Sequence, residues 1–225
     1  MQQAAASAAL AHNYSVFCAT YGVIDLGGRY KLIIFDLGGV LINYNEYEYY
    51  AYLSSKTNIA PEKISHAFKS LLPRLESGKI TMRSFEAMAA KAVGLPKTKL
   101  EWSYAFKRLA SKNVKVEQLI KRLRKMYKVV LLTNNNRSRY EIAARGYFNP
   151  KIFDRTFLSF MMGMCKPHAN IYRQVLKEMH AEPEETIFID NMEENVSGAR
   201  RLGIHGIVFT NYKQLVREMK KIGVM

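Results

Sequence analysis

An apolar run that ends on one carboxylate constrains the fold of this chain more than any other feature of its sequence. Residues 31–42 read Lys-Leu-Ile-Ile-Phe-Asp-Leu-Gly-Gly-Val-Leu-Ile, so Asp36 follows an apolar stretch and two glycines come shortly after it. Apolar runs of this kind are typical of strands buried on both faces of a parallel sheet. In open α/β folds, ligands bind at the carboxyl ends of such strands. The pattern therefore predicts that Asp36 lies at a functional edge of a parallel sheet.

A similar stretch occurs earlier in the chain. Residues 23–28 read Val-Ile-Asp-Leu-Gly-Gly, which echoes residues 34–39, but the charged Arg29 follows it. Only the second copy has a continuous apolar strand before it and further apolar residues after it. We therefore assign the functional role to Asp36 rather than to Asp25, and we expect residues 1–29 to form a poorly ordered N-terminal extension.

The size and composition of the chain fit one sizeable core with a small accessory domain. It has 225 residues, of which 48% are apolar, and this argues against global disorder. Its two cysteines do not make a disulfide framework, and no Cys/His cluster has the spacing of a zinc site, so oxygen ligands would have to hold any metal. No uninterrupted apolar segment reaches the ~20 residues of a transmembrane helix. We expect a cytoplasmic protein with no membrane partner.

The formal net charge of +15 is large, and part of it is concentrated in residues 121–125. Such charge can attract nucleic acid or small phosphorylated substrates through long-range steering. Within residues 119–126, however, basic and apolar side chains alternate at helical spacing, as on the solvated face of an amphipathic helix. Nucleic acid is therefore not the expected partner, and the sequence is compatible with a monomer or a homodimer.

Residues 43–112 carry helical signals and little strand pattern. Thr81 can cap a helix that ends near Gly94, and apolar residues from Trp102 to Leu109 mark another. Before these, Pro61 can open a helix with one apolar face, made of Ile64, Ala67, Phe68, Leu71 and Leu72. The sequence thus predicts an all-helical insertion after the first strand.

Residues 30–42 and 113–225 are expected to form an α/β core. Strands that alternate with helices imply right-handed crossovers and a parallel sheet covered on both faces. We therefore predict a Rossmann-like α/β fold with a small all-helical unit inserted after its first strand. The later strands are predicted at 129–132, 156–160, 186–190 and 206–209, and the helices at 115–127, 168–180, 194–202 and 212–222.

Side chains with complementary chemistry follow four of the predicted strands. They are Asp36, Thr133 with Asn134, Lys166, and Asp190. Any one of them alone often only caps the next helix. Together they suit phosphoryl transfer, because a carboxylate can attack phosphorus, hydroxyl and amide groups can hold phosphoryl oxygens, and a lysine can offset negative charge. A second carboxylate, with waters and phosphate oxygens, suits Mg²⁺.

Four short motifs in this order resemble those of the haloacid dehalogenase (HAD) superfamily, and more closely its magnesium-dependent phosphatase branch similar to bacterial glucose-1-phosphatases. They are Phe-Asp-Leu-Gly-Gly-Val at 35–40, Leu-Thr-Asn at 132–134, Gly-Met-Cys-Lys-Pro at 163–167 and Phe-Ile-Asp-Asn at 188–191. The resemblance implies that the helical insertion, residues 43–112, is the family's cap, which closes over small substrates and excludes water.

The resemblance also implies a metal site and a nucleophile. Asp36 would attack phosphorus and would bind Mg²⁺ together with the Gly38 carbonyl and Asp190. Lys166 would offset negative charge on the nucleophile and on the transition state.

Substrate contacts are implied on both sides of this site. Thr133, Asn134 and Gly39 would bind the phosphoryl group. Tyr47 belongs to a group of tyrosines at the start of the insertion and is our first candidate for contacting the rest of the substrate. Packing of these tyrosines between the cap and the core is the alternative interpretation.

Two positions depart from the commoner pattern of the family. Many of its phosphatases carry a second aspartate two residues after the nucleophile, as general acid and base, and this chain has Gly38 there. That help is typically worth about 10²–10⁴-fold in rate. The fourth motif has Asn191 where a second aspartate is common, which removes one negative charge from the metal site, and Glu194 is a nearby carboxylate that could compensate for this loss.

The sequence therefore predicts a Mg²⁺-dependent phosphatase that removes phosphate from a small phosphorylated metabolite, such as a sugar phosphate, through an aspartyl phosphate. One alternative is a catalytically impaired binding or regulatory protein, in which Gly38 and Asn191 record lost chemistry. A further alternative is a metal-free haloacid dehalogenase, in which Asp36 would attack carbon. Asp190 argues against the dehalogenase, since a metal-free site does not call for that carboxylate beside the nucleophile.

Overall fold

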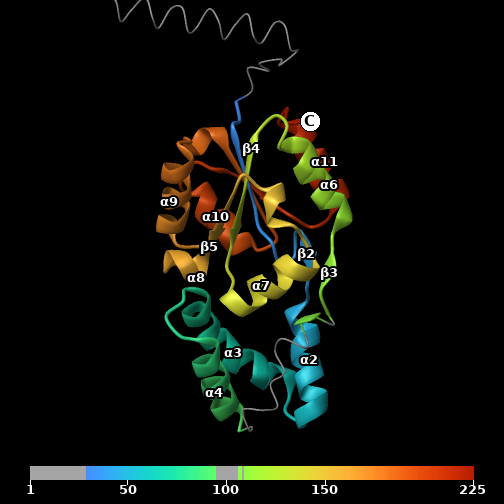
Figure 1. Ribbon diagram of the computed structural model, residues 1–225, viewed down its shortest axis with the longest axis vertical. Helices are drawn as coiled ribbons and strands as arrows, with labels where there is room; N and C mark the ends of the chain where they lie inside the picture. Colours follow the sequence, from blue (N-terminus) through green and yellow to red (C-terminus); the bar gives the residue numbers. More distant parts are fainter. Residues whose placement is uncertain (1–28, 95–105, 108) are drawn as a thin grey trace, which may run out of the picture.

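A five-stranded parallel sheet forms the centre of the molecule (Figure 1). The structure is a computed structural model that describes residues 29–94, 106–107 and 109–225. The order in the sheet, β5-β4-β1-β6-β7, places the first strand in the middle, flanked by β4 and β6. The five strands are β1 (Leu32–Phe35), β4 (Lys128–Thr133), β5 (Arg155–Leu158), β6 (Thr186–Asp190) and β7 (His205–Val208).

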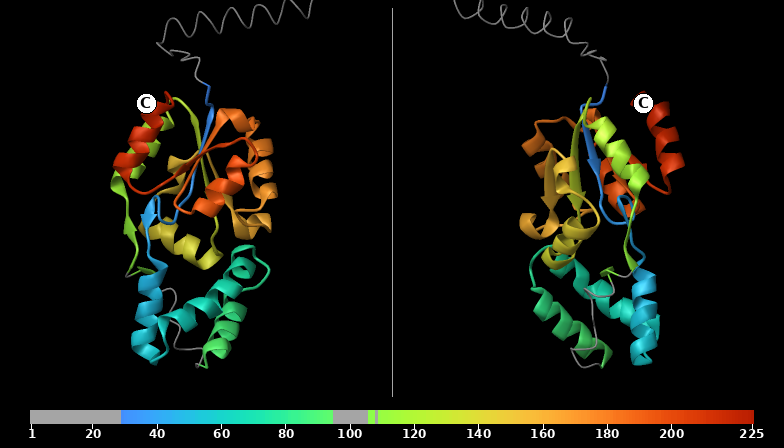
Figure 2. Two further views of the ribbon diagram at one scale, coloured as in Figure 1. Left: turned by 180° about the vertical axis from the view of Figure 1, so that it is seen from behind. Right: turned by 45° about the vertical axis from the view of Figure 1, so that its right-hand side comes forward.

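Alternate residues of β1 belong to two different hydrophobic clusters, as the pleat of a strand requires. Ile33 and Phe35 pack in the cluster that contains α6 (Val114–Leu123) and α11 (Tyr212–Lys221). Leu32 and Ile34 pack in the cluster that contains α9 (Ala169–Met179) and α10 (Glu193–Arg200). Figures 1 and 2 show these helix pairs on opposite faces of the sheet. The predicted Rossmann-like α/β fold is confirmed.

Three helices lie beyond the carboxyl ends of the strands and have a hydrophobic cluster of their own (Figure 1). They are α2 (Glu46–Thr57), α3 (Pro61–Glu76) and α4 (Met82–Val93). The apolar face predicted for the helix that Pro61 opens is buried along its whole length. The hydroxyl of Thr81 accepts a hydrogen bond from the Ser84 amide, as expected of an N-cap. The helix predicted around residues 102–109 lies mostly outside the described residues.

Two short antiparallel strands connect these helices to the core. They are β2 (Ile42–Asn43) and β3 (Ser111–Lys112), so the chain leaves and re-enters the core side by side (Figure 2). The Asn113 side chain donates a hydrogen bond to the Val40 carbonyl at 3.1 Å, and its amide donates to the Leu41 carbonyl at 2.9 Å. These bonds hold the two connecting segments together directly after the β1 loop.

The structure shifts some element boundaries. The strand predicted at 156–160 ends at Leu158, because Ser159 begins the short helix α8 (Ser159–Met162). Helix α7 (Arg137–Gly146) was not predicted, nor was α2 as a separate helix. Two 3₁₀ turns, Pro150–Ile152 and Pro183–Glu185, precede β5 and β6.

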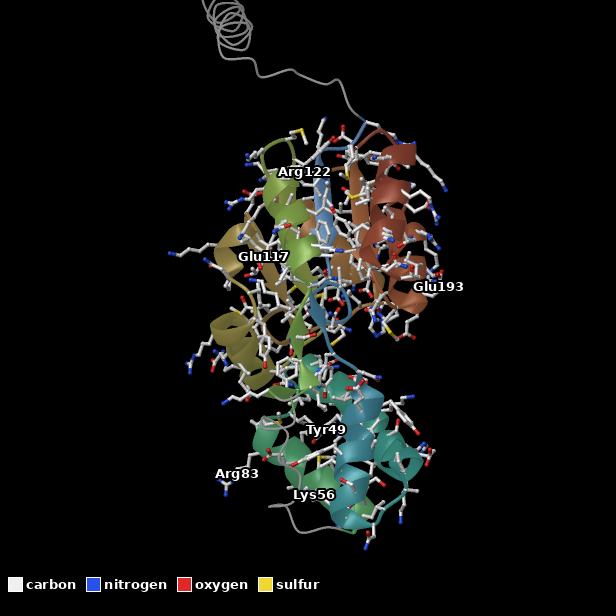
Figure 3. All side chains as sticks on the ribbon, turned by 90° about the vertical axis from the view of Figure 1, so that its right-hand side faces the viewer. Tyr49, Lys56, Arg83, Glu117, Arg122 and Glu193 are labelled. Atoms are coloured by element: carbon white, nitrogen blue, oxygen red, sulfur yellow. The ribbon has the colours of Figure 1, made fainter. Side chains whose placement is uncertain are left out.

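The basic side chains are spread over the surface. Lys56 and Arg83 are exposed on α2 and α4 of the helical unit, and Arg122 is exposed on α6 of the core (Figure 3). The apolar residues of α6 that follow Val114 are buried, and its basic residues form the solvated face that the spacing predicted. Asp25 and almost all of the predicted N-terminal extension lie outside the described residues. Among the residues the structure does describe, no helix is long and apolar enough to cross a membrane.

Candidate active site

The register of the central strands brings the predicted site residues together. Phe35 of β1 pairs with Ile189 of β6 and with Leu131 of β4. Asp36 and Asp190 are the next residues along neighbouring strands, and the Asp36 amide donates a hydrogen bond to the Ile189 carbonyl at 2.9 Å. Because parallel strands end at a common edge, this pairing alone places both carboxylates and the nearby Thr133 at one site.

Lys166 lies between the two carboxylates. Its Nζ is 2.8 Å from Oδ1 of Asp36 and 2.6 Å from Oδ2 of Asp190. It also donates a hydrogen bond to the Leu132 carbonyl at 3.1 Å. The three side chains are buried, with residue exposures of 4% for Lys166, 7% for Asp36 and 0% for Asp190. Charge-assisted hydrogen bonds therefore fix the lysine and both carboxylates in a water-poor environment.

The electrostatics of the cluster reflect two negative charges against one positive charge. Burial raises the pKa of Asp36 to about 6, with Lys166 opposing the shift and Asp190 adding to it. Burial alone would lower the pKa of Lys166, but the charges of Asp190 and Asp36 more than offset this, so its pKa is raised. The lysine stays charged, and the cluster keeps an excess of negative charge.

Asn134 holds the loop that carries Lys166. Its side-chain Nδ2 donates to the Lys166 carbonyl at 2.9 Å, and its Oδ1 accepts from the Lys166 amide at 2.9 Å. The Lys166–Pro167 peptide bond is cis. Both polar atoms of the Asn134 side chain therefore position the loop of the lysine, and the binding of a phosphoryl group by Asn134 stays a prediction.

Asp190 is oriented by the loop that follows β6. Its Oδ1 accepts a hydrogen bond from the Met192 amide at 2.8 Å, and its Oδ2 accepts from Nδ2 of Asn195 at 3.0 Å. Asn195 is buried, whereas Glu194, which we considered as a replacement carboxylate, is exposed. Asn195 was not among the predicted site residues.

A cavity of about 430 Å³ opens above the carboxylates, which is large enough for a small metabolite. Its floor includes Asp36, Gly38, Gly39, Thr133, Asn134 and Lys166, and its far side includes Tyr44, Glu46, Tyr47 and Glu76. Tyr47 lines the cavity and is 60% exposed, so it is accessible to a ligand. The cavity therefore joins the strand ends to the helical unit.

Arg139 is a buried cation in the same cavity. Its guanidinium carbon lies 5.2 Å from the centre of the Tyr44 ring and 5.7 Å from that of Phe106, within the range of cation–π contacts. Its Nη1 is 4.0 Å from Oε1 of Glu46. Neither Arg139 nor Glu76 was among the predicted site residues, because neither lies in a recognisable motif.

Gly39 lies under the side chain of Asn191. It has a φ of +76°, and a Cβ placed on it would be 2.4 Å from Nδ2 of Asn191. Its amide donates to the Ile42 carbonyl at 2.7 Å. Gly39 therefore lies where the β1 loop meets the fourth motif, and its binding of a phosphoryl group stays a prediction.

We expect Gly39→Ala to destabilise the protein by about 1–3 kcal/mol, because the added methyl group clashes with Asn191 as well as straining the backbone. Gly94→Ala is the matched control, since Gly94 has a φ of +74° and open space around its missing Cβ. Urea denaturation of both variants checks this. The Gly39 variant should lose more stability than the control, and adding Asn191→Ala should recover the difference; equal losses would contradict the close packing.

The donor set fits a hard cation with oxygen ligands. Asp36 and Asp190 supply carboxylates, and Gly38 lines the same cavity, so its carbonyl is available as a third donor. Within residues 29–94, 106–107 and 109–225, no group of three or more His, Cys, Asp or Glu side chains is arranged to hold a metal. Mg²⁺ needs only one or two carboxylates when waters and phosphate oxygens complete its shell. The excess negative charge of the cluster favours such a dication.

A sequence model of the haloacid dehalogenase-like hydrolases matches residues 30–203. The chain belongs to this family of hydrolases, as its four motifs predicted.

Several curated proteins are similar to it. The chain is 30% identical to mouse acyl-CoA dehydrogenase family member 10 over 87% of its own length, but it spans only 19% of that protein. It is 25% identical to sesquiterpene phosphatase astK of Aspergillus oryzae, covering 86% of this chain and 96% of that one. It is 26% identical to D-ribitol-5-phosphate phosphatase of Bacteroides thetaiotaomicron, covering 77% of this chain and 88% of that one.

Solved structures of the family superpose closely on the chain. A HAD family enzyme from Bacteroides thetaiotaomicron, crystallised with magnesium and inorganic phosphate, has a TM-score of 0.68 at 26% identity, covering 83% of this chain and 98% of that one. A HAD-like hydrolase from Porphyromonas gingivalis has a TM-score of 0.73 at 27% identity, covering 87% and 98%.

Proposed function

We propose that the protein is a Mg²⁺-dependent phosphatase that acts on a small phosphorylated metabolite through an aspartyl phosphate on Asp36. The observation that carries this proposal is the contact of one buried lysine with two buried carboxylates on the floor of a cavity. Two relatives that align over most of their length are phosphatases of small phosphorylated compounds, and a similar enzyme was crystallised with magnesium and phosphate.

In the proposed reaction, a free carboxylate oxygen of Asp36 attacks phosphorus and the leaving group departs toward the cavity. Lys166 keeps Asp36 ionised and oriented, because its ammonium bonds the other oxygen, Oδ1. Thr133, at the end of β4, supplies a hydroxyl near the phosphoryl group. Asp36 and Asp190 would hold Mg²⁺, which would supply positive charge to the phosphoryl oxygens. Asn134 and Asn195 act as positioning residues for Lys166 and Asp190.

We further propose that residues 43–112 act as a cap that selects the substrate. Tyr44, Glu46 and Tyr47 bring aromatic and carboxylate groups from this segment to the far side of the cavity. An amphipathic ring with a polar tip suits a sugar or another polyhydroxylated compound. The substrate's organic part would therefore contact the cap, while its phosphate contacts the strand ends.

Two other functions are less well supported. A metal-free dehalogenase has no use for Asp190, which the structure places 2.6 Å from the lysine that also contacts Asp36. A binding or regulatory protein without turnover does not need Lys166 buried between two carboxylates. A partner RNA would require a continuous basic surface, whereas the basic residues of α6 form the solvated face of an amphipathic helix.

A panel of phosphorylated metabolites, with sugar and sugar-alcohol phosphates included, tests the proposed function. Release of inorganic phosphate should depend on Mg²⁺ and should stop on chelation. Hydrolysis of a generic aryl phosphate provides the reference rate. No release from any compound in the presence of Mg²⁺, together with RNA binding that persists at physiological salt, would favour the binding protein.

We expect Mg²⁺ to stabilise the folded protein. At 100 times its Kd, a ligand that binds only the folded state adds about 2.7 kcal/mol to the free energy of unfolding. Asp190→Asn should abolish this gain, because it removes a ligand. Asp154→Asn is the control, since Asp154 lies before β5 and pairs with Arg124 instead. Thermal denaturation with and without Mg²⁺ gives the answer, and an equal gain in both variants would contradict the metal site.

A further inference from the structure

The proposed phosphatase lacks the aspartate that many members of its family carry two residues after the nucleophile. In this chain that position is Gly38, which carries no side chain. An alkoxide leaving group needs a proton, and the water that hydrolyses an aspartyl phosphate must lose one. Within the described residues that line the cavity, the carboxylates other than Asp36 are Glu46 and Glu76. Both come from the helical unit, on the side from which a leaving group would depart.

Glu76 is the better placed of the two. It is the last residue of α3, where that helix meets the core, and its carbonyl accepts a hydrogen bond from the Ser159 hydroxyl at 2.5 Å. The same hydroxyl accepts from the Asn135 amide at 2.9 Å, just after the second motif. Glu46, in contrast, has a side chain that is 43% exposed and accepts a hydrogen bond from the Tyr50 hydroxyl.

The surroundings of Glu76 suit a group that both gives and takes a proton near neutral pH. Burial raises the pKa of its carboxyl to about 7. Arg139 on α7 opposes the shift, Glu46 on α2 adds to it, and Lys166 and Asp36 act in opposite senses from the floor of the cavity. The negative end of the α3 dipole also disfavours the carboxylate form.

We propose that Glu76 is the general acid and base of this enzyme. It takes the place of the aspartate that many family phosphatases have at the position of Gly38. This role rests on the proposed phosphatase function. A cap residue, rather than a residue of the first motif, then performs proton transfer, so that the segment that recognises the substrate also completes the catalytic site.

The steps balance without any further reactant. In the first, Asp36 forms a bond to phosphorus, the bond between phosphorus and the leaving oxygen breaks, and the Glu76 carboxyl gives its proton to that oxygen. In the second, the Glu76 carboxylate takes a proton from water as the water oxygen bonds to phosphorus. The bond between phosphorus and Asp36 breaks, inorganic phosphate leaves, and both carboxyl groups return to their starting states.

Glu76→Gln separates this role from a structural one. An alkyl phosphate has a poor leaving group, so its kcat/KM should fall about 10²–10⁴-fold. The leaving group of an aryl phosphate with an acidic phenol departs without protonation by a general acid. Its first turnover should therefore stay fast and release a burst of phenol in a molar amount equal to that of the enzyme. Phosphorylated protein should then accumulate, which intact-mass spectrometry detects. Glu62→Gln is the control, because Glu62 is exposed at the start of the same helix.

The pH dependence provides a second readout. The acid must be protonated, so kcat/KM of wild type for the alkyl phosphate should fall as pH rises through about 7, the pKa of Glu76. In Glu76→Gln, this fall should disappear. A fall that persists in the variant would show that another group, such as the substrate, titrates.

Gly38→Asp provides a rescue. A Cβ at Gly38 would have no atom within 4 Å, so the side chain of an aspartate there would begin in open space. Added to Glu76→Gln, it should restore most of the alkyl phosphatase activity and remove the accumulated phosphoenzyme. Equal losses for alkyl and aryl phosphates, no phosphoenzyme and no rescue would overturn the role of Glu76. If Asp36→Asn abolishes hydrolysis while Glu76→Gln does not affect it, only this inference fails; if wild type hydrolyses neither substrate, the proposed function fails with it.

Discussion

Asp36→Asn should lower phosphatase activity by at least about 10³-fold, because an amide cannot form the proposed aspartyl phosphate. The loss should appear in kcat, and no phosphorylated protein should be detectable by mass spectrometry. Folding should be preserved. Burial raises the pKa of Asp36 to about 6, so the ionised carboxylate lowers the stability of the folded protein near neutral pH. The neutral amide of the variant removes this charge and leaves Lys166 paired with Asp190.

The chain contains a matched control for this substitution. Asp25→Asn alters the same local sequence, Val-Ile-Asp-Leu-Gly-Gly, in the copy at residues 23–28. Activity should be unchanged in this variant. Full activity in Asp36→Asn, or an equal loss in both variants, would contradict the assignment of the nucleophile.

The sheet was predictable because burial on both faces leaves a simple signal. Residues such as Ile34 and Val130 are fully buried, and a strand of this kind reads as a continuous apolar run. The predicted strand at 186–190 matches β6 from end to end. The order of motifs then placed Asp36, Lys166 and Asp190 at one edge, and the structure brings these three into contact.

The missed helices lack a simple apolar stripe. In α2, tyrosines occur on several faces of the helix, and only Tyr49, Tyr50 and Leu53 are buried. In α7, the buried residues are Arg139 and Ala143, so a charged residue occupies a position where the pattern requires an apolar one. Periodicity in sequence does not identify helices of this kind.

The part of the site that sequence reasoning missed depends on tertiary contacts between distant segments. Glu76 ends an ordinary amphipathic helix, and the hydrogen bond from Ser159 to its carbonyl shows where that helix meets the core. The two hydrogen bonds from Asn134 to the Lys166 backbone likewise join positions 32 residues apart. Gly38 of the first motif and the half-buried Glu76 of the helical unit thus become related only in three dimensions.

Lys166→Met should destabilise the protein by about 3–5 kcal/mol, because it leaves two buried carboxylates without their counter-ion. Such a loss is a large fraction of the roughly 5–15 kcal/mol that stabilises an ordinary domain. Urea denaturation in chelator-containing buffer near pH 7.5 measures it. Lys31→Met is the control, because the Lys31–Glu185 pair is at the surface, with 69% and 30% of the two side chains exposed, and should contribute less than about 1 kcal/mol.

The loss in Lys166→Met should depend on pH in a defined direction. Burial already raises the pKa of Asp36 from 3.8 to about 6 with the lysine present, and removing the lysine raises it further. A carboxyl whose folded-state pKa exceeds its unfolded-state value favours folding below the unfolded value, and this contribution disappears as pH rises through the folded value. The stability of the variant should therefore be closest to that of wild type near pH 4, and the difference should be largest above pH 6.

Removing one of the two carboxylates as well should restore part of the lost free energy of unfolding. In Lys166→Met with Asp36→Asn, a single buried charge remains on Asp190, which still accepts hydrogen bonds from Met192 and Asn195. The double variant should thus be more stable than Lys166→Met alone, although each single substitution removes a native contact. If the losses of stability in the two single variants simply add in the double variant, Lys166 does not act by offsetting repulsion between the two carboxylates. A double variant that is more stable than Lys166→Met would show that this repulsion is present at the proposed nucleophile and metal site.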